Sequence, residues 1–273
     1  MRVSQLPSGA CALTLLAGVL LASDAHAAPP KPKARPKVSV EEIAVMLSST
    51  QEDELRTALE TAATLHAADV MPLLEDRVRA GLSRDLLQVA LDSLQLLDDK
   101  SATSLLSDLA LHRRPEVRAR VLEVIGSLKA VHLESVLVRG LHDLDANVQK
   151  AAASALAESG ARASVPVLEK ALERGIEPAG AALGKLAKPD ELGHLLDYVG
   201  RLPLASVTPM LSALLSRRDL GEADKLRAVT KVTTLPGDDA VNGSEALLQE
   251  LPSDASPRVK RALSEAIEKG NAQ

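Results

Sequence analysis

Five charged residues recur along the chain at an interval of 31 residues. They are Arg77, Asp108, Arg139, Lys170 and Arg201, and we call them the charged ridge. A constant interval places them at the same position of successive structural units. Four cations in such a row can bind a peptide or protein segment through ionic contacts. The alternative is a solvated face that forms ion pairs between neighbouring units, each worth less than about 1 kcal/mol.

The apolar residues follow the same interval. Four columns are Leu55, Leu86, Val117, Val148 and Ala179; Leu59, Ala90, Val121, Ala152 and Leu183; Ala63, Leu94, Ile125, Leu156 and Ala187; and Leu74, Leu105, Val136, Val167 and Tyr198. A period of about 20 to 50 residues is typical of a solenoid. The sequence therefore predicts stacked repeats that bury one continuous core.

The spacing inside each unit is helical. Val117, Val121 and Ile125 recur at steps of four, and residues 131–141 repeat the pattern. We expect two antiparallel helices per unit, each of roughly 11 to 15 residues. About six or seven such hairpins would form an all-α, right-handed superhelix with a ~31-residue period.

Capping residues mark where these helices begin. We expect N-caps at Ser83, Asp145 and Thr50, and Pro115 at a helix-opening position. One column of acidic residues lies in the first turn of these helices, where a negative charge interacts favourably with the helix dipole. Its members are Glu54, Asp85 and Glu116.

The segments Pro115–Ile125, Asp145–Leu156 and Pro257–Ile267 share one pattern, in which a valine followed by Arg, Gln or Lys precedes a run rich in small and apolar residues. This pattern resembles the HEAT-repeat family, particularly the short bacterial phycobilin-lyase HEAT-like type. The resemblance covers residues 50–203 well and 204–269 loosely. It implies that the second helices line the concave surface that binds partners, which would include the charged ridge. An Asp of the turn within a repeat, which HEAT units often pair with a basic residue, does not align here.

The two ends of the chain differ from the repeats. Residues 1–28 are typical of a signal peptide, with Arg2, a largely apolar run from Ala10 to Ala22 and small residues at Ala25–Ala27. An uncleaved anchor or buried helix is the alternative. Cleavage would remove Cys11, the only cysteine. We expect an exported protein, periplasmic or secreted, with no transmembrane segment after signal removal.

Residues 29–38 are rich in Pro, Lys and Arg and are predicted to be an extended tether. We expect the tether to be a plain spacer; the alternative is weak contact with an anionic surface. Residues 38–273 hold 27 basic and 36 acidic side chains, a net charge of −9. This balance, with a single aromatic residue, argues against nucleic-acid binding.

The solenoid is predicted over residues 39–273, with regular repeats in 50–203 and degenerate repeats and a C-terminal cap in 204–273. Ser39, closing a capping box with Glu42, should begin an N-terminal cap helix that runs to Leu47. The region 217–256 breaks the period and is predicted to contain an irregular connection, with turns at 236–239 and 242–244.

No catalytic motif is found. The segment 180–186 resembles a phosphate loop but has three residues between its glycines and Leu186 where Ser or Thr would bind magnesium. The run His142–Asp145 offers metal ligands, although Asp145 is better explained as a helix cap. We therefore expect no enzyme activity, no cofactor and no metal site.

The predicted function is an exported, non-enzymatic scaffold or adaptor that binds a protein partner through the repeat surface. Two alternatives remain. One is an accessory subunit of an enzyme, holding a small molecule in the solenoid groove by analogy with phycobilin lyases. The other is a passive structural component of the cell envelope.

Overall fold

The computed structural model describes residues 38–272, so the predicted signal peptide and nearly all of the tether lie outside the described residues. The described residues are all-α and form no β-strand, apart from an isolated bridge between Val199 and Leu202. The helices are α1 Val40–Leu47, α2 Glu52–Ala62, α3 Ala67–Ala80, α4 Arg84–Leu97, α5 Thr103–Leu109, α6 Pro115–Ser127, α7 Glu134–Gly140, α8 Ala146–Glu158, α9 Val165–Glu173, α10 Pro178–Leu186, α11 Leu192–Leu196, α12 Leu204–Ser216, α13 Glu222–Thr233, α14 Asp239–Glu250 and α15 Pro257–Asn271.

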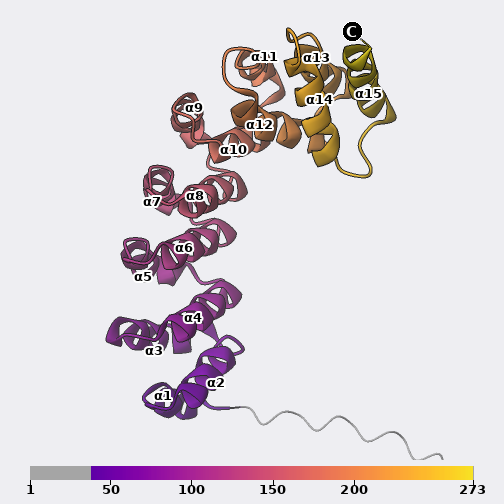
Figure 1. Cartoon of the computed structure of the whole chain (residues 1–273). Helices are drawn as coiled ribbons and strands as arrows, with labels where there is room; N and C mark the ends of the chain where they lie inside the picture. The colour runs from indigo at the N-terminus through magenta and orange to yellow at the C-terminus, as the bar shows by residue number, and fades with distance from the viewer. Residues whose placement is uncertain (1–37, 273) are drawn as a thin grey trace, which may run out of the picture. The chain divides into compact units, whose positions relative to one another are not determined.

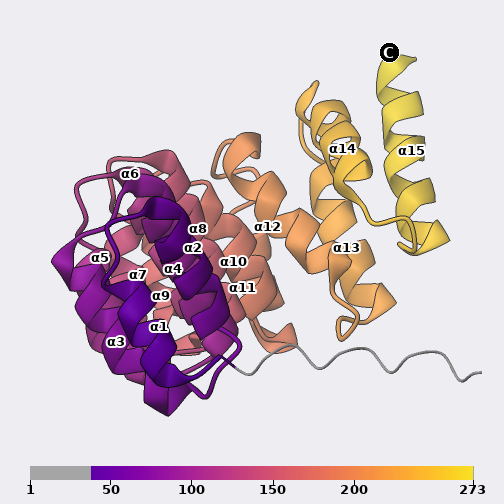
Figure 2. The same ribbon diagram turned by 90° about the horizontal axis from the view of Figure 1, so that it is seen from below.

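Within residues 38–272 the helices alternate between two layers (Figure 1). The first helices of the hairpins, α2, α4, α6, α8, α10 and α12, pack in sequence along one layer. The second helices, α3, α5, α7, α9 and α11, follow one another along the other layer. Figure 2 shows the same succession from below, ending in α13, α14 and α15. The predicted solenoid of helical hairpins is confirmed.

The core consists of the apolar columns that repeat every 31 residues. Every member of the four columns is buried except Ala63 and Val167, which are half-buried. Each hairpin presents apolar residues to the hairpins before and after it, so the core runs continuously from Ile43 to Leu263.

Four of the five second helices are shorter than predicted, whereas α3, with 14 residues, has the predicted length. α5 and α7 have 7 residues each, α9 has 9 and α11 has 5. A 3-10 turn precedes each of them; the four turns are Lys100–Ala102, Val131–Leu133, Arg162–Ser164 and Pro189–Glu191. These tighter turns take up residues that the apolar pattern assigns to a regular helix.

Most of the predicted helix starts are confirmed. Asp145 caps α8 by accepting hydrogen bonds from the N–H groups of Asn147 and Val148, and Ser39 forms its capping box with Glu42. Pro115 is the first residue of α6. Ser83 precedes α4 without a side-chain hydrogen bond. Thr50 was the wrong choice for α2, because Gln51 is the N-cap residue there.

The predicted irregular connection contains two helices, α13 and α14. Gly237, with a φ of 60°, lies in the turn between them, as the Pro236–Asp239 pattern predicted. The second predicted turn, at Asn242–Ser244, is wrong, because these residues lie inside α14. Gly243 is buried there, and a Cβ at this position would lie 2.7 Å from Val232 Cγ1. Glycine at this position therefore allows α14 to pack closely against α13.

The shortest first helix, α10, is held at its C-terminus by two arginines. Arg162, from the preceding hairpin, donates to the carbonyl of Leu186 and pairs with Glu191 at 3.1 Å. Arg217, from the end of α12, donates to the carbonyls of Gly184 and Ala187. Cationic donors satisfy carbonyl groups that the helix itself leaves free. Both neighbours of α10 are thereby tied to it.

Candidate functional site

The structure places four members of the charged ridge on successive second helices. Arg77 lies on α3, Asp108 on α5, Arg139 on α7 and Lys170 on α9. The prediction that Arg201 also lies on a second helix is wrong. α11 ends at Leu196, and Arg201 follows in a turn where Gly200 adopts a φ of +85°. A residue in that left-handed region cannot continue a right-handed helix.

Four of the five ridge side chains are exposed to solvent, and Arg77 is half-buried. Arg77 donates to the carbonyl of Gly81 at 3.0 Å, while its Nε atom is buried without a hydrogen-bond partner in the described structure. Arg201 lies over the ring of Tyr198, with its guanidinium carbon 5.8 Å from the ring centroid. The ridge is thus accessible along most of its length.

The ridge side chains do not form the ion pairs between repeats that the alternative requires. Across residues 38–272, the side chains of Asp108, Arg139 and Lys170 make no hydrogen bond and no ion pair. Their charges therefore remain available to a ligand.

Other residues, on the second helices and on the 3-10 turns that precede them, make the polar links between repeats. Thr103 Oγ1 lies 2.8 Å from His132 Nε2, and Glu134 accepts a hydrogen bond from the Ser164 hydroxyl. Glu169 lies 3.2 Å from the Nε2 atom of His194. Each contact joins one repeat to the next. The sequence alone does not reveal these pairs, because their members are 25 to 30 residues apart and belong to different columns.

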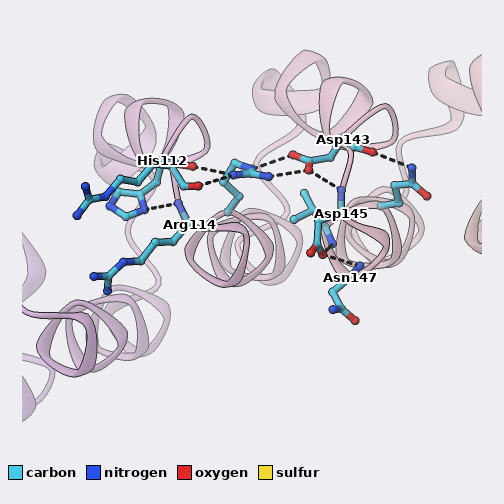
Figure 3. Close-up of polar contacts among 9 residues, drawn as sticks. His112, Arg114, Asp143, Asp145 and Asn147 are labelled. Carbon is cyan, nitrogen blue, oxygen red and sulfur yellow. Dashed lines mark hydrogen bonds and ion pairs between the residues drawn. The ribbon is translucent and has the colours of Figure 1, made fainter.

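A second polar network ties two consecutive inter-repeat turns together. Arg118 on α6 forms two parallel hydrogen bonds to Asp143, Nε to Oδ2 at 2.8 Å and Nη2 to Oδ1 at 2.7 Å. Its Nη1 atom donates to the carbonyl of His112 at 2.9 Å. Figure 3 shows the turns that carry His112 and Asp143 facing each other across this network. Two-pronged arginine–carboxylate contacts are among the stronger polar interactions in proteins.

The position of this network explains why the aspartate that HEAT units often carry in the turn within a repeat could not be aligned with this sequence. Asp143 lies between two repeats, and its partner is on a first helix. Gln149, which is 31 residues after Arg118, donates from Nε2 to the carbonyl of Asp143 at 2.8 Å. Each of these two side chains donates to the carbonyl of the residue six positions before it. The column shared by Arg118 and Gln149 is therefore the sequence signal from which the network could have been predicted.

The pKa of the Asp143 carboxyl lies below its usual value. The hydrogen bonds from Arg118 are the main cause, and the N–H group of Asp145 acts in the same direction. Burial opposes the shift without cancelling it. The ionised form of Asp143 is therefore the form that the fold stabilises.

This shift predicts how stability depends on pH. Since the pKa is lowered on folding, Asp143 contributes stability above its unfolded-state pKa of about 3.9 and loses it as pH falls through the folded-state value. We expect the difference in unfolding free energy between wild type and Asp143→Asn to be full at about pH 6 and to shrink below about pH 4. Urea titrations at several pH values would measure it. Asp108→Asn is the control, because it removes an exposed carboxylate that has no partner within residues 38–272. A difference for Asp143→Asn that is constant down to about pH 2 would contradict the expectation.

The remaining sequence candidates have structural roles. The segment 180–186 lies inside α10, and its glycines contact α12. In the run His142–Asp145, Asp143 binds Arg118 and Asp145 caps α8. Within residues 38–272, no three His, Cys, Asp or Glu side chains lie close enough to share a metal ion.

Helical hairpins stacked at a 31-residue interval define an α-solenoid. In this solenoid a row of charged side chains on the second helices is accessible to solvent. Residues 102–179 match the family model for HEAT repeats, which confirms the resemblance predicted from the sequence. This match spans the repeats from α5 to the start of α10, which are similar to HEAT repeats. No curated protein sequence is similar enough to the chain to count as a match.

Two solved structures are partly similar to the chain. The complex of CpcE and CpcF of phycocyanin lyase from Nostoc sp. PCC7120 is 17% identical, with a TM-score of 0.47, over 89% of this chain and 99% of that chain. A designed armadillo repeat protein in complex with the peptide (KR)4 is 18% identical, with a TM-score of 0.36, over 79% of this chain and 100% of that one. These likenesses are of repeat architecture alone, and no substrate or partner is carried over from them. In the described part of the chain, no helix has the length and apolar character needed to cross a membrane.

Proposed function

We propose that this chain is a non-enzymatic scaffold or adaptor that binds a protein partner through its second-helix layer, with the charged ridge as the contact surface. The observation that carries the proposal is that three charged side chains of the ridge are exposed and have no ion-pair partner within residues 38–272. Asp108, Arg139 and Lys170 are exposed and unpaired within residues 38–272, while neighbouring polar residues tie the repeats together. A regular row of such charges suits an extended partner segment.

The first experiment is crosslinking of the tagged chain in its native host, followed by mass spectrometry of the attached peptides. One dominant partner with crosslinks near Lys170 and on the neighbouring second helices is the expected result. Recovery of no specific partner above background would refute the adaptor function.

The ridge also predicts how binding of the crosslinked partner responds to mutation. We expect the double variant Arg139→Glu, Lys170→Glu to weaken binding by at least about tenfold, because both contacts become repulsive. Binding by the wild type should weaken as salt concentration rises. Lys150→Glu reverses an exposed charge on α8, in the other layer, and should leave affinity unchanged. Equal losses in the double variant and in Lys150→Glu would argue against the ridge.

A pocket between α11 and α13 favours the accessory-subunit function as a second candidate. It has a volume of about 820 Å³, and Leu196, Leu226 and Lys231 are among its lining residues. This volume is within the range of small-molecule sites. A ligand bound to the folded chain must raise the melting temperature, so a screen of small molecules by thermal shift tests this candidate.

Export is the remaining part of the proposal. Its support is the pattern of residues 1–28, which is typical of a signal peptide. The intact mass of the protein from the envelope or medium should correspond to a chain that begins near Pro29. A mass that includes residues 1–28 would contradict export with cleavage.

A further inference from the structure

A pocket of about 270 Å³ lies at the edge where two consecutive inter-repeat turns meet. The lining residues important here are Leu111, His112, Arg113, Arg118, Arg139 and Asp143. The turn between α5 and α6 forms one side, and α7 with the turn that follows it forms the other. Figure 3 shows this edge, with His112 and Asp143 on the two turns. Buried Leu122 and Val136 give the pocket apolar walls.

The pocket has an unbalanced positive charge. Three arginines line it against one aspartate, and that aspartate is already bound by Arg118. The side chains of Arg113 and Arg139 make no hydrogen bond or ion pair in the part of the chain that the structure describes. Residues 38–273 carry a net charge of −9, so this is a local concentration of cations on an acidic protein. Such a site attracts a carboxylate.

His112 adds a hydrogen-bond donor to the lining. Its Nδ1 atom accepts a hydrogen bond from the N–H group of Arg114 at 3.2 Å. In the neutral ring, this contact assigns the proton to Nε2. The neutral ring therefore has its Nε2 N–H group as a donor for an acceptor.

Two exposed leucines lie on the turns that form the pocket; Leu111 is one of its lining residues and Leu144 follows the lining residue Asp143. In residues 38–272 only four large apolar side chains are exposed, and two of them, Leu111 and Leu144, lie on the turns that form this edge. Leu111 is 63% exposed and Leu144 is 104% exposed. Nothing in the fold requires leucine at these two positions, because neither side chain is part of the core. Apolar groups beside a cationic pocket are complementary to a segment that carries both acidic and apolar residues.

We propose that this pocket is the anchor site for an acidic segment of the partner protein. A carboxylate of the segment binds Arg113 and Arg139, and an adjacent apolar side chain packs on Leu111 and Leu144. This inference rests on the adaptor function proposed above and adds the chemistry of the partner. Arg139 belongs to both surfaces, so the anchor site is continuous with the charged ridge.

Site-specific photo-crosslinking in the native host tests the location. A photoreactive amino acid replaces Leu144 at the pocket, Lys170 on the ridge or Leu96, an exposed leucine on α4, in three separate full-length variants. We expect one partner to be captured at Leu144 and Lys170, through an acidic peptide at Leu144, and none at Leu96. Capture at Lys170 but not at Leu144 would overturn the anchor site and leave the adaptor function standing. Absence of capture at all three would refute the adaptor function itself. Crosslinks at Leu144 that join only copies of this chain would replace the proposal with self-association.

A defined probe tests the chemistry independently of the partner. The probe is a fluorescein-labelled short peptide of glutamate and leucine, and the same peptide with glutamine in place of glutamate is its control. We expect the glutamate peptide alone to bind, and Arg113→Glu and Leu144→Ser each to weaken its binding by about tenfold or more. Lys150→Glu and Leu96→Ser are the matched control variants and should bind as the wild type does. Equal binding of the two peptides, equal losses in the control variants, or no saturable binding would each overturn the proposal.

Discussion

Replacing Gly184 with valine is expected to lower the free energy of unfolding by about 3 kcal/mol. A Cβ at this position would overlap the backbone carbonyl of Met210 and lie 2.7 Å from Ala213 Cβ. Gly180, one turn earlier, would place a Cβ 2.9 Å from the carbonyl oxygen of Ser206. α10 and α12 thus approach backbone to backbone along two glycines. The obstructing atoms belong to the main chain of a helix, so they cannot move aside as a flexible side chain would.

Urea titration would measure this loss, and Gly193→Ala provides the control. Gly193 is also helical, on α11, but a Cβ there meets no atom within 4 Å. Alanine at this position should leave stability unchanged or raise it slightly, since glycine is disfavoured in helices. If valine at Gly184 cost no more than alanine at Gly193, the close packing of α10 on α12 would be wrong.

Replacing Arg118 with alanine is expected to cost about 2 to 3 kcal/mol of unfolding free energy. The variant loses both hydrogen bonds to Asp143 and those to the carbonyls of His112 and Arg113. It also leaves the Asp143 carboxylate unpaired, although only 15% of that side chain is exposed. Lysine should restore little of the loss, because an ammonium group cannot form two parallel hydrogen bonds to a carboxylate.

Arg120→Ala is the matched control for this experiment. Arg120 lies on the same helix and is also 19% exposed, but its partners Asp92 and Glu123 are 53% and 52% exposed. A carboxylate that can return to water tolerates the loss of its partner, so we expect less than about 1 kcal/mol. Thermal or urea unfolding of both variants would settle the comparison. Equal costs would show that the Arg118 network is no stronger than a surface ion pair.

The repeat architecture was predictable from the sequence because burial acts on every unit in the same way. Residues such as Leu59 and Val121 fill equivalent places in the core, so selection for one packing arrangement appears as a column. The cap at Asp145 and the proline at the start of α6 were predictable for a related reason. Their chemistry depends on residues no more than three positions away.

Features that depend on contacts between units were not predictable in this way. Arg118 and Asp143 are 25 residues apart, and each has an ordinary local setting, so only the approach of two turns brings them together. Gly243 has the sequence context of a turn, yet packing against Val232 places it inside a helix. At α2, Ser49 accepts from the N–H group of Gln51 and donates to Glu54, so the helix begins later than a cap at Thr50 would allow.

Tyr198 has a practical consequence for studying this protein in solution. It is the only tyrosine, and the chain has no tryptophan or phenylalanine. Tyr198 is 3% exposed; its ring lies edge-on to His194, with centroids 5.6 Å apart, and is next to Arg201 at one end of the charged ridge. All near-ultraviolet absorption and intrinsic fluorescence by aromatic side chains therefore originates from one repeat. An unlabelled chain already carries a single optical reporter, whose emission would register a partner seated over the last ridge residue, or the local opening of that repeat, without interference from any other aromatic residue.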